Sequence, residues 1–344
     1  MTSKRLGFFT RLLDDVSAQQ RYRLATEQIV KAEQLGFDSA WVAQHHFHAD
    51  EGGLPSPLVF LAHVAANTRR IRLGTGVITL PMEHPLRVAE DTAVLDLLSN
   101  GRLEVGIGSG GTPSSFAAFG HDSAQRGEIL ARYLAQVRAA WRGEPLSGDG
   151  NQLYPEAAHL NKRVWQATFS VDGAVRAGKA GDGLMLSRTQ PRPENFPNAT
   201  LADLQNQMID AYLAALPEGV QPRILGSRSV FVADDRQLAL SLAETGLRRS
   251  AARLGAFRPI RQGSVAELID SFDSHVGTAE DVIATLQADS SLARVTDVSF
   301  QVHSIDPPHA LILRSLELIA TQVAPALGWQ PAVKQKNTLG QETI

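Results

Sequence analysis

Short apolar runs alternate with longer amphipathic stretches along nearly the whole chain. The runs are continuously apolar rather than alternating in polarity, which is typical of strands covered on both faces of a parallel sheet. We therefore predict strands at residues 6–9, 39–42, 71–80, 103–107, 164–168, 184–187, 224–233 and 298–302.

Between these runs, apolar residues recur at helical spacing. Tyr22, Ala25, Ile29 and Ala32 mark one helix, and Gly36 lies just past its end, where a glycine cap is expected. Further helices are predicted over residues 58–66, 86–98, 130–141, 172–180, 201–216 and 312–323. Strands that alternate with helices over the full length predict an α/β protein. About eight such units favour a closed (β/α)8 TIM barrel with insertion loops over an open doubly wound sheet.

Two segments interrupt the alternation. Residues 143–161 are rich in Gly, Pro and Asn, and we expect a loop with a small hairpin there. Residues 249–277 show no clear period, and a loop of that length is usually a lid or disordered. No change in composition marks a linker, so we expect a single barrel over residues 1–330 and a flexible polar tail over residues 331–344.

Composition narrows the function classes. The net charge of −3 offers no basic field to nucleic acid or to an anionic membrane. The absence of cysteine excludes disulfides, thiolate catalysis and cysteine-based metal sites. No apolar stretch approaches the roughly 20 residues of a membrane helix, and no apolar signal segment follows the basic residues at the N-terminus. We therefore expect a cytoplasmic enzyme that acts on a small molecule.

The densest group of chemically active side chains follows the predicted strand 39–42. His45, His46 and His48 lie within four residues, and Asp50 comes next. In a barrel, the C-terminal ends of the strands form the catalytic face. An ordinary polar loop explains a single histidine well, but three so close together favour a site. His46, His48 and Asp50 also have zinc-site spacing, which keeps a metal-dependent hydrolase as an alternative, although no second ligand cluster follows another strand.

Three more segments lie at predicted strand ends. Gly74 and Gly76 allow a flat ligand to approach the backbone, although a β-bulge explains them equally well. Residues 106–111 match G-x-G-x-x-G, the dinucleotide motif of a Rossmann dehydrogenase, but they follow the fourth strand instead of the first. Ser170 or Asp172 can cap the short helix that follows, and the free N–H groups of that helix suit a phosphate.

Taken together, these residues resemble the bacterial-luciferase-like flavin-dependent monooxygenases. The resemblance covers nearly the whole chain and is dense from about residue 36 to residue 120. No single motif is decisive, but their order and spacing are specific. The matching segments are 36–41, 45–47, 74–78, 84–91, 95–102, 106–111 and 119–120, with weaker matches at 181–183, 276–281 and 323–327.

The resemblance implies a (β/α)8 barrel that binds FMN, reduced elsewhere by an NAD(P)H-dependent flavin reductase. Reduced FMN would react with O2 to a C4a-hydroperoxide that oxygenates a small organic substrate. His45 would be the active-site histidine beside the flavin, and we expect the next residue, His46, to point away. A strained or cis peptide at Gly76–Val77 would lie under the flavin ring. The family is also dimeric, and the apolar residues of helix 86–98 agree with a homodimer.

The resemblance further places Ser170 and Val171 at the FMN phosphate and Ser187 at the flavin edge. Where members of the family have an arginine for the phosphate, this chain has Ser109. Arg188 directly follows the next strand, and we expect its guanidinium to replace that charge. A deazaflavin-dependent oxidoreductase on the same barrel and a non-catalytic flavin-binding relative are the alternatives. No metal, nucleic acid or membrane partner is expected.

Overall fold

The computed structural model describes residues 4–254, 260, 263–302 and 307–330. Parallel strands form a closed ring, because β10 pairs with β8 on one side and with β1 on the other. The predicted (β/α)8 barrel is therefore confirmed. The ring consists of β1 (Arg5–Thr10), β2 (Ser39–Val42), β3 (Arg72–Thr75), β5 (Leu103–Gly108), β6 (Val164–Ala167), β7 (Gly183–Leu186), β8 (Ile224–Val232) and β10 (Asp297–Gln301).

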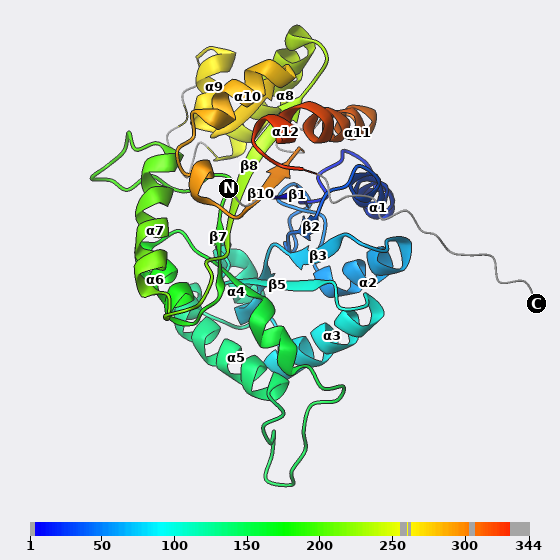
Figure 1. The fold of residues 1–344 in the computed structure, drawn as a ribbon, viewed down its shortest axis with the longest axis vertical. Helices are drawn as coiled ribbons and strands as arrows, with labels where there is room; N and C mark the ends of the chain where they lie inside the picture. Colours follow the sequence, from blue (N-terminus) through cyan, green and yellow to red (C-terminus); the bar gives the residue numbers. More distant parts are fainter. Residues whose placement is uncertain (1–3, 255–259, 261–262, 303–306, 331–344) are drawn as a thin grey trace, which may run out of the picture.

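Helices form an outer layer around the strands (Figure 1). Several begin at a serine or threonine whose hydroxyl accepts a hydrogen bond from the first turn, as at Thr200 and Thr278. The helices are α1 (Ala18–Gln34), α2 (Pro57–Asn67), α3 (Pro85–Leu98), α4 (Pro113–Ala118), α5 (Arg126–Trp141), α6 (Val171–Lys179), α7 (Leu201–Ala215), α8 (Arg236–Leu254), α9 (Val265–Ser271), α10 (Ala279–Gln287), α11 (His309–Leu318) and α12 (Ala324–Ala326), with a π-helical turn (Ile319–Val323) before α12.

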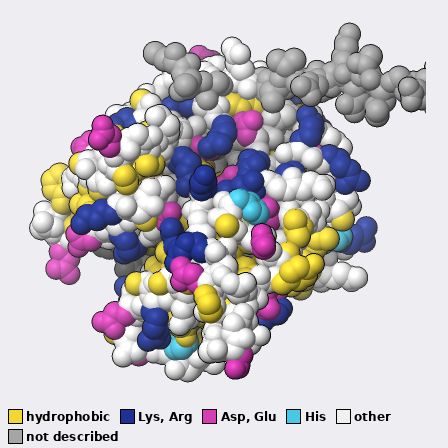
Figure 2. Space-filling model, turned by 60° about the horizontal axis from the view of Figure 1, so that its bottom comes forward, with side chains coloured by type: hydrophobic (Ala, Val, Ile, Leu, Met, Phe, Trp, Pro, Cys, Tyr) yellow, Lys and Arg dark blue, Asp and Glu magenta, His cyan; other side chains and the backbone are white. Residues whose placement is uncertain are grey.

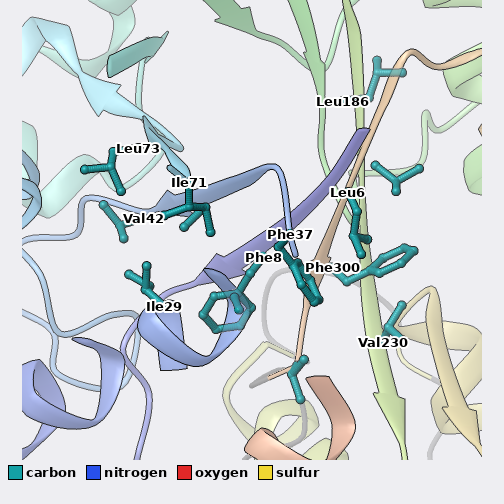
Figure 3. Packing of buried hydrophobic residues seen from close by; sticks show 14 of the residues in the cluster. Leu6, Phe8, Ile29, Phe37, Val42, Ile71, Leu73, Leu186, Val230 and Phe300 are labelled. Atoms are coloured by element: carbon teal, nitrogen blue, oxygen red, sulfur yellow. The ribbon is translucent and has the colours of Figure 1, made fainter. Parts of the chain in front are cut away.

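The core has two parts, because successive strand residues face opposite sides of the barrel wall. Phe8 of β1 and Phe300 of β10 pack between the strands and the helices (Figure 3). Inside the barrel, Trp41 and Trp165 meet edge to face, with ring centroids 5.7 Å apart. These two indoles fill the interior below the catalytic face.

The predicted strand 71–80 is interrupted. β3 ends at Thr75, and a two-residue strand, β4 (Ile78–Thr79), pairs separately with β5. The peptide between them, Gly76–Val77, is cis, as expected from the family resemblance. The Thr75 hydroxyl bridges the break: it donates to the carbonyl of Gly106 (2.7 Å) and accepts from its N–H (2.9 Å). Because residues 71–80 form one continuous apolar run, the sequence pattern gave no sign of this interruption.

The predicted lid over residues 249–277 is wrong for the described part of that segment. α8 continues to Leu254, α9 follows, and β9 (Ser274–Gly277) extends the sheet by pairing with the end of β8. Leu268 and Phe272 anchor α9 in the core, and Ser264 caps it. Residues 255–259 and 261–262 lie outside the described residues, as does the predicted tail 331–344.

Residues 143–161 form a loop that projects beyond α5 (Figure 1). The hairpin expected there is absent from this described segment: a turn joins the Leu146 N–H to the carbonyl of Asn151 (2.7 Å), but no strand forms. The segment ends in a 3-10 helix (Ala158–Arg163) that leads into β6. It lies at the opposite end of the barrel from the carboxyl ends of the strands.

Basic and acidic side chains are interspersed over the face of the molecule in Figure 2, with hydrophobic side chains between them. No single sign of charge covers this face. Among the described residues, no helix is both long enough and apolar enough to span a bilayer.

Candidate active site

A cavity of about 1130 Å³ lies at the carboxyl ends of the strands. Residues distant in sequence meet there because all barrel strands are parallel. Val171 begins α6 but does not line the cavity. The other predicted site residues all line it: His45, Gly76, Val77, Ser109, Ser170, Ser187 and Arg188.

Small residues line one wall of the cavity. A Cβ at Gly76 would lie 3.0 Å from the ring of Phe9, and a Cβ at Gly108 would lie 2.9 Å from Cγ2 of Val77. Glycine is therefore needed at both positions for the backbone and the neighbouring side chains to pack this closely. Together with Ala167, these residues form a wall without projecting polar groups, which suits a planar aromatic ring system.

His45 is positioned by the loop that follows β2. Its N–H donates to the carbonyl of Leu54 (3.0 Å), and its ring packs tightly against Gly52, where an added Cβ would lie only 2.5 Å from Nδ1. The half-buried ring lines the cavity. The loop thus fixes the orientation of His45 through a contact that leaves no room for a larger residue at position 52.

Gln44 ties this loop to the segment after β4. Its Oε1 accepts from the Thr79 N–H (2.7 Å), and its Nε2 donates to the carboxylate of Glu83 (2.5 Å) and to the carbonyl of Pro55 (3.1 Å). Burial raises the pKa of Glu83, and the hydrogen bond from Gln44 opposes that rise. The histidine loop and the cis-peptide segment are therefore held together as one unit.

His46 also lines the cavity, so the expectation that it points away is wrong. Its ring meets Phe119 edge to face at 4.9 Å and lies 5.7 Å from Phe47. Burial lowers the pKa of His46, which favours the neutral ring at neutral pH. The loop between β5 and α5 supplies Phe119, and this contact turns the second histidine inward.

The metal alternative gains no support. His48 is exposed, and its Nε2 lies 3.3 Å from the Ser114 hydroxyl. Within the part of the chain that the structure describes, no three His, Asp or Glu side chains are arranged to hold a metal ion. The Rossmann alternative is excluded by the closed barrel, where Gly106 is needed because a Cβ there would lie 2.0 Å from the Thr75 carbonyl oxygen.

The charged residues that line the cavity in the described part of the chain are all basic. They are four arginines, Arg11, Arg126, Arg176 and Arg188, and no aspartate or glutamate lines it. Of these four, only Arg188 was predicted from the sequence, and its Nη1 donates to the Ser229 hydroxyl on β8 (3.4 Å). Arg11 directly follows β1, and its position at a strand end could have identified it as a cavity residue from the sequence. Arg126 and Arg176 lie on helices. The sequence pattern of a helix does not show whether an arginine faces a cavity or the solvent, so these two residues were not predicted.

The segment between β6 and α6 caps the N-terminus of α6, as expected. The Ser170 hydroxyl accepts from the Gly173 N–H (3.1 Å) and lies 3.3 Å from the Thr168 hydroxyl. Asp172, which would repel a phosphate, is exposed and does not line the cavity. The cavity thus reaches the N-terminus of α6, and the acidic side chain of Asp172 does not face it.

Comparison with known proteins agrees with this architecture. The model of the luciferase-like monooxygenase family matches residues 6–292. The 4-hydroxyprotoasukamycin monooxygenase of Streptomyces nodosus subsp. asukaensis is 31% identical over 319 residues, which cover 85% of this chain and 83% of the relative. The F420-dependent glucose-6-phosphate dehydrogenase of Amycolatopsis mediterranei is 31% identical over 173 residues, 47% of this chain and 52% of the relative.

A solved structure shares the fold over nearly its full length. It is the oxygenating constituent of 3,6-diketocamphane monooxygenase from Pseudomonas putida, a type II Baeyer–Villiger monooxygenase in complex with FMN. It superposes with a TM-score of 0.74 at 21% identity and covers 94% of this chain and 98% of that chain. With the family match over most of its length, this chain is a member of the luciferase-like monooxygenase family and a flavin-dependent monooxygenase.

Proposed function

We propose that the chain uses FMN, reduced by a separate enzyme, together with O2 to oxygenate a small organic substrate. The observation that carries this proposal is the apolar wall at Gly76–Val77, which lies in one cavity with His45 and with four arginines. A planar, anionic cofactor matches both features. The 4-hydroxyprotoasukamycin monooxygenase, which is similar to this chain over most of its length, supports the same reaction class.

The residues present fit FMN. Gly76 and Val77 would support the isoalloxazine ring, Ser187 would line its edge, and Ser109 together with the start of α6 at Ser170 and Val171 would receive the phosphate. Arg188 stays a predicted phosphate donor. The absence of acidic side chains among the described cavity residues leaves nothing to repel two negative charges.

Bound reduced FMN would supply the electrons and the site of oxygen activation. The protein must then hold a proton near the reacting atoms and keep water out. His45 is our candidate for the proton, because imidazole takes and returns a proton near neutral pH. His46, Phe47 and Phe119 form an aromatic rim beside it that limits access of water.

A deazaflavin-dependent oxidoreductase is the second candidate, because one relative is named as F420-dependent. The two candidates share the barrel and the histidine but differ in the need for oxygen. A hydride-transferring enzyme would turn over without O2, whereas the proposed monooxygenase would not.

We also propose two protein partners. The solved relative is named as an oxygenating constituent, which supports a separate reductase that delivers reduced FMN to this chain. The second partner is another copy of the chain, since α2 and α3 expose several large apolar side chains: Val59, Val94, Leu97 and Leu98.

Oxygen incorporation tests the proposed function. The chain would be incubated with FMN, a flavin reductase, NADH, a metabolite extract and O2 made of the heavy isotope. We expect one heavy oxygen atom in an organic product and the other in water. Heavy oxygen found only in H2O2 and water, with every extract, would contradict a monooxygenase. Omitting this chain from the mixture provides the control for free reduced flavin.

A further inference from the structure

We propose that Arg176 binds the phosphate of the cofactor and thereby makes the site select FMN over riboflavin, an inference that rests on the proposed function. Arg176 is on α6 and lines the cavity, as does Ser170 at the start of the same helix. Long helical side chains lean toward the helix N-terminus, which brings the guanidinium of Arg176 toward the first turn.

The first turn of α6 cannot balance a phosphate alone. The Ser170 hydroxyl already caps the helix by accepting from Gly173, and the Thr168 hydroxyl accepts from the Ser170 N–H (3.1 Å). Both groups are neutral, whereas the phosphate is a dianion. A nearby cation is therefore needed, and the Ser109 hydroxyl on the cavity wall does not supply one.

A chain of buried polar groups holds Arg176 in place. Its Nε donates to Oε1 of Gln166 on β6 (3.0 Å), and Nε2 of Gln166 donates to the carboxylate of Asp182 (2.7 Å). Asp182 is also paired with Arg138 of α5. An ionised carboxylate only accepts, so the amide NH2 of Gln166 faces Asp182 and its oxygen faces Arg176. Burial raises the pKa of Asp182, and Arg138 opposes that rise.

This anchoring leaves the outer fork of the guanidinium for a ligand. The bond from Nε to Gln166 is the one hydrogen bond that Arg176 makes within the described residues, and both Nη groups can donate elsewhere. A guanidinium fork holds two oxygens of a phosphate at once. Arg126 also lines the cavity, but its Nη1 is bonded to the Ser123 carbonyl (2.9 Å), and Arg188 is directed to β8.

The test is the ratio of FMN affinity to riboflavin affinity, measured anaerobically on the reduced flavins with the full-length chain. Arg176→Ala should lower this ratio roughly 10- to 150-fold by weakening FMN alone, and Arg176→Lys should lower it less. Arg188→Ala should lower it less than Arg176→Ala. Arg132→Ala, an exposed arginine of α5 outside the cavity, is the matched control and should leave the ratio unchanged.

The outcomes separate this inference from the proposed function. A wild-type ratio in Arg176→Ala would overturn the inference, and a loss confined to Arg188→Ala would give the phosphate to that residue instead. If the unmodified chain binds neither flavin, the proposed function itself fails. Thermal melts of each variant show whether it is folded, and riboflavin binding retained in Arg176→Ala confirms an intact ring site.

Discussion

At the scale of single residues, His45 carries the proposed chemistry. We predict that His45→Ala folds and binds FMN but releases H2O2 faster when bound reduced FMN meets O2. General acid–base catalysis typically contributes 10²–10⁴-fold, so the loss of substrate oxygenation should be large, and the oxygen should leave as H2O2 instead. H2O2 can be followed by a peroxidase-coupled dye.

His48→Ala is the matched control for this prediction, since His48 lies on the same loop, is exposed and contacts Ser114. It should release H2O2 at the rate of the unmodified chain. Equal rates in His45→Ala and the unmodified chain would remove His45 from the proton-transfer role. A large effect of His48→Ala would instead point back to the metal hypothesis.

Gly52 offers a second test at this scale, because it controls the position of His45 without touching the cofactor site. A methyl group at position 52 would lie 2.5 Å from Nδ1 of His45, which is closer than real contacts allow. We predict that Gly52→Ala displaces the ring and raises H2O2 release as His45→Ala does. Gly148→Ala, where an added Cβ meets no atom within 4 Å, should have no effect.

Residue types at strand ends located part of the candidate site. His45 and Arg188 follow predicted strands, whereas Ser109 was named from the family resemblance, and the parallel barrel brings all three to one cavity. Arg176 was missed because its role depends on Gln166 and Asp182, which only the fold places beside it. The inward turn of His46 was missed for the same reason, since its contact with Phe119 joins two loops.

At the scale of elements, helices α2 and α3 contain the surface proposed for dimerisation. On α3, Val94, Leu97 and Leu98 lie three and four positions apart, hence on one face, and are 46%, 59% and 60% exposed. Exposed apolar side chains grouped in this way mark an interaction surface. On adjacent α2, Val59 is 73% exposed.

We predict that the chain sediments at twice its mass of 37.1 kDa and that Leu97→Glu combined with Leu98→Glu yields monomers. Burying two carboxylates in an apolar interface costs more than the lost contacts alone. Leu213→Glu, at a 40% exposed leucine on α7, is the control and should leave the dimer intact. Sedimentation velocity at micromolar concentration measures all three. A monomeric unmodified chain would contradict the proposal.

Element types were predictable where the periodicity was long and strong, as in α1 and α3. The predicted elements were wrong where the local sequence pattern indicates one structure and tertiary contacts impose another. Residues 71–80 look like one strand, but Thr75 and the cis peptide divide them. Residues 265–277 look irregular because α9 and β9 are each short, and few of their residues, such as Leu268, reach the core.

At the scale of the whole molecule, the order of strands and helices predicted the barrel, because parallel strands joined by helices close in few ways. The extension of the sheet by β9 was not predictable, since it depends on β8 running beyond the ring to pair with a short later strand. What the barrel binds was predictable only through the family resemblance. Composition alone predicted only an enzyme that acts on a small molecule.

The proposed function depends most directly on the binding of reduced FMN in this barrel. An anaerobic titration of the chain with reduced FMN, oxidised FMN and F420 tests it. Trp41 lines the cavity and meets Trp165 edge to face, so their fluorescence reports occupancy. We predict saturation by one reduced FMN per chain, with tighter binding than F420. Saturation by F420 without binding of FMN, or no response to any of the three, would contradict it.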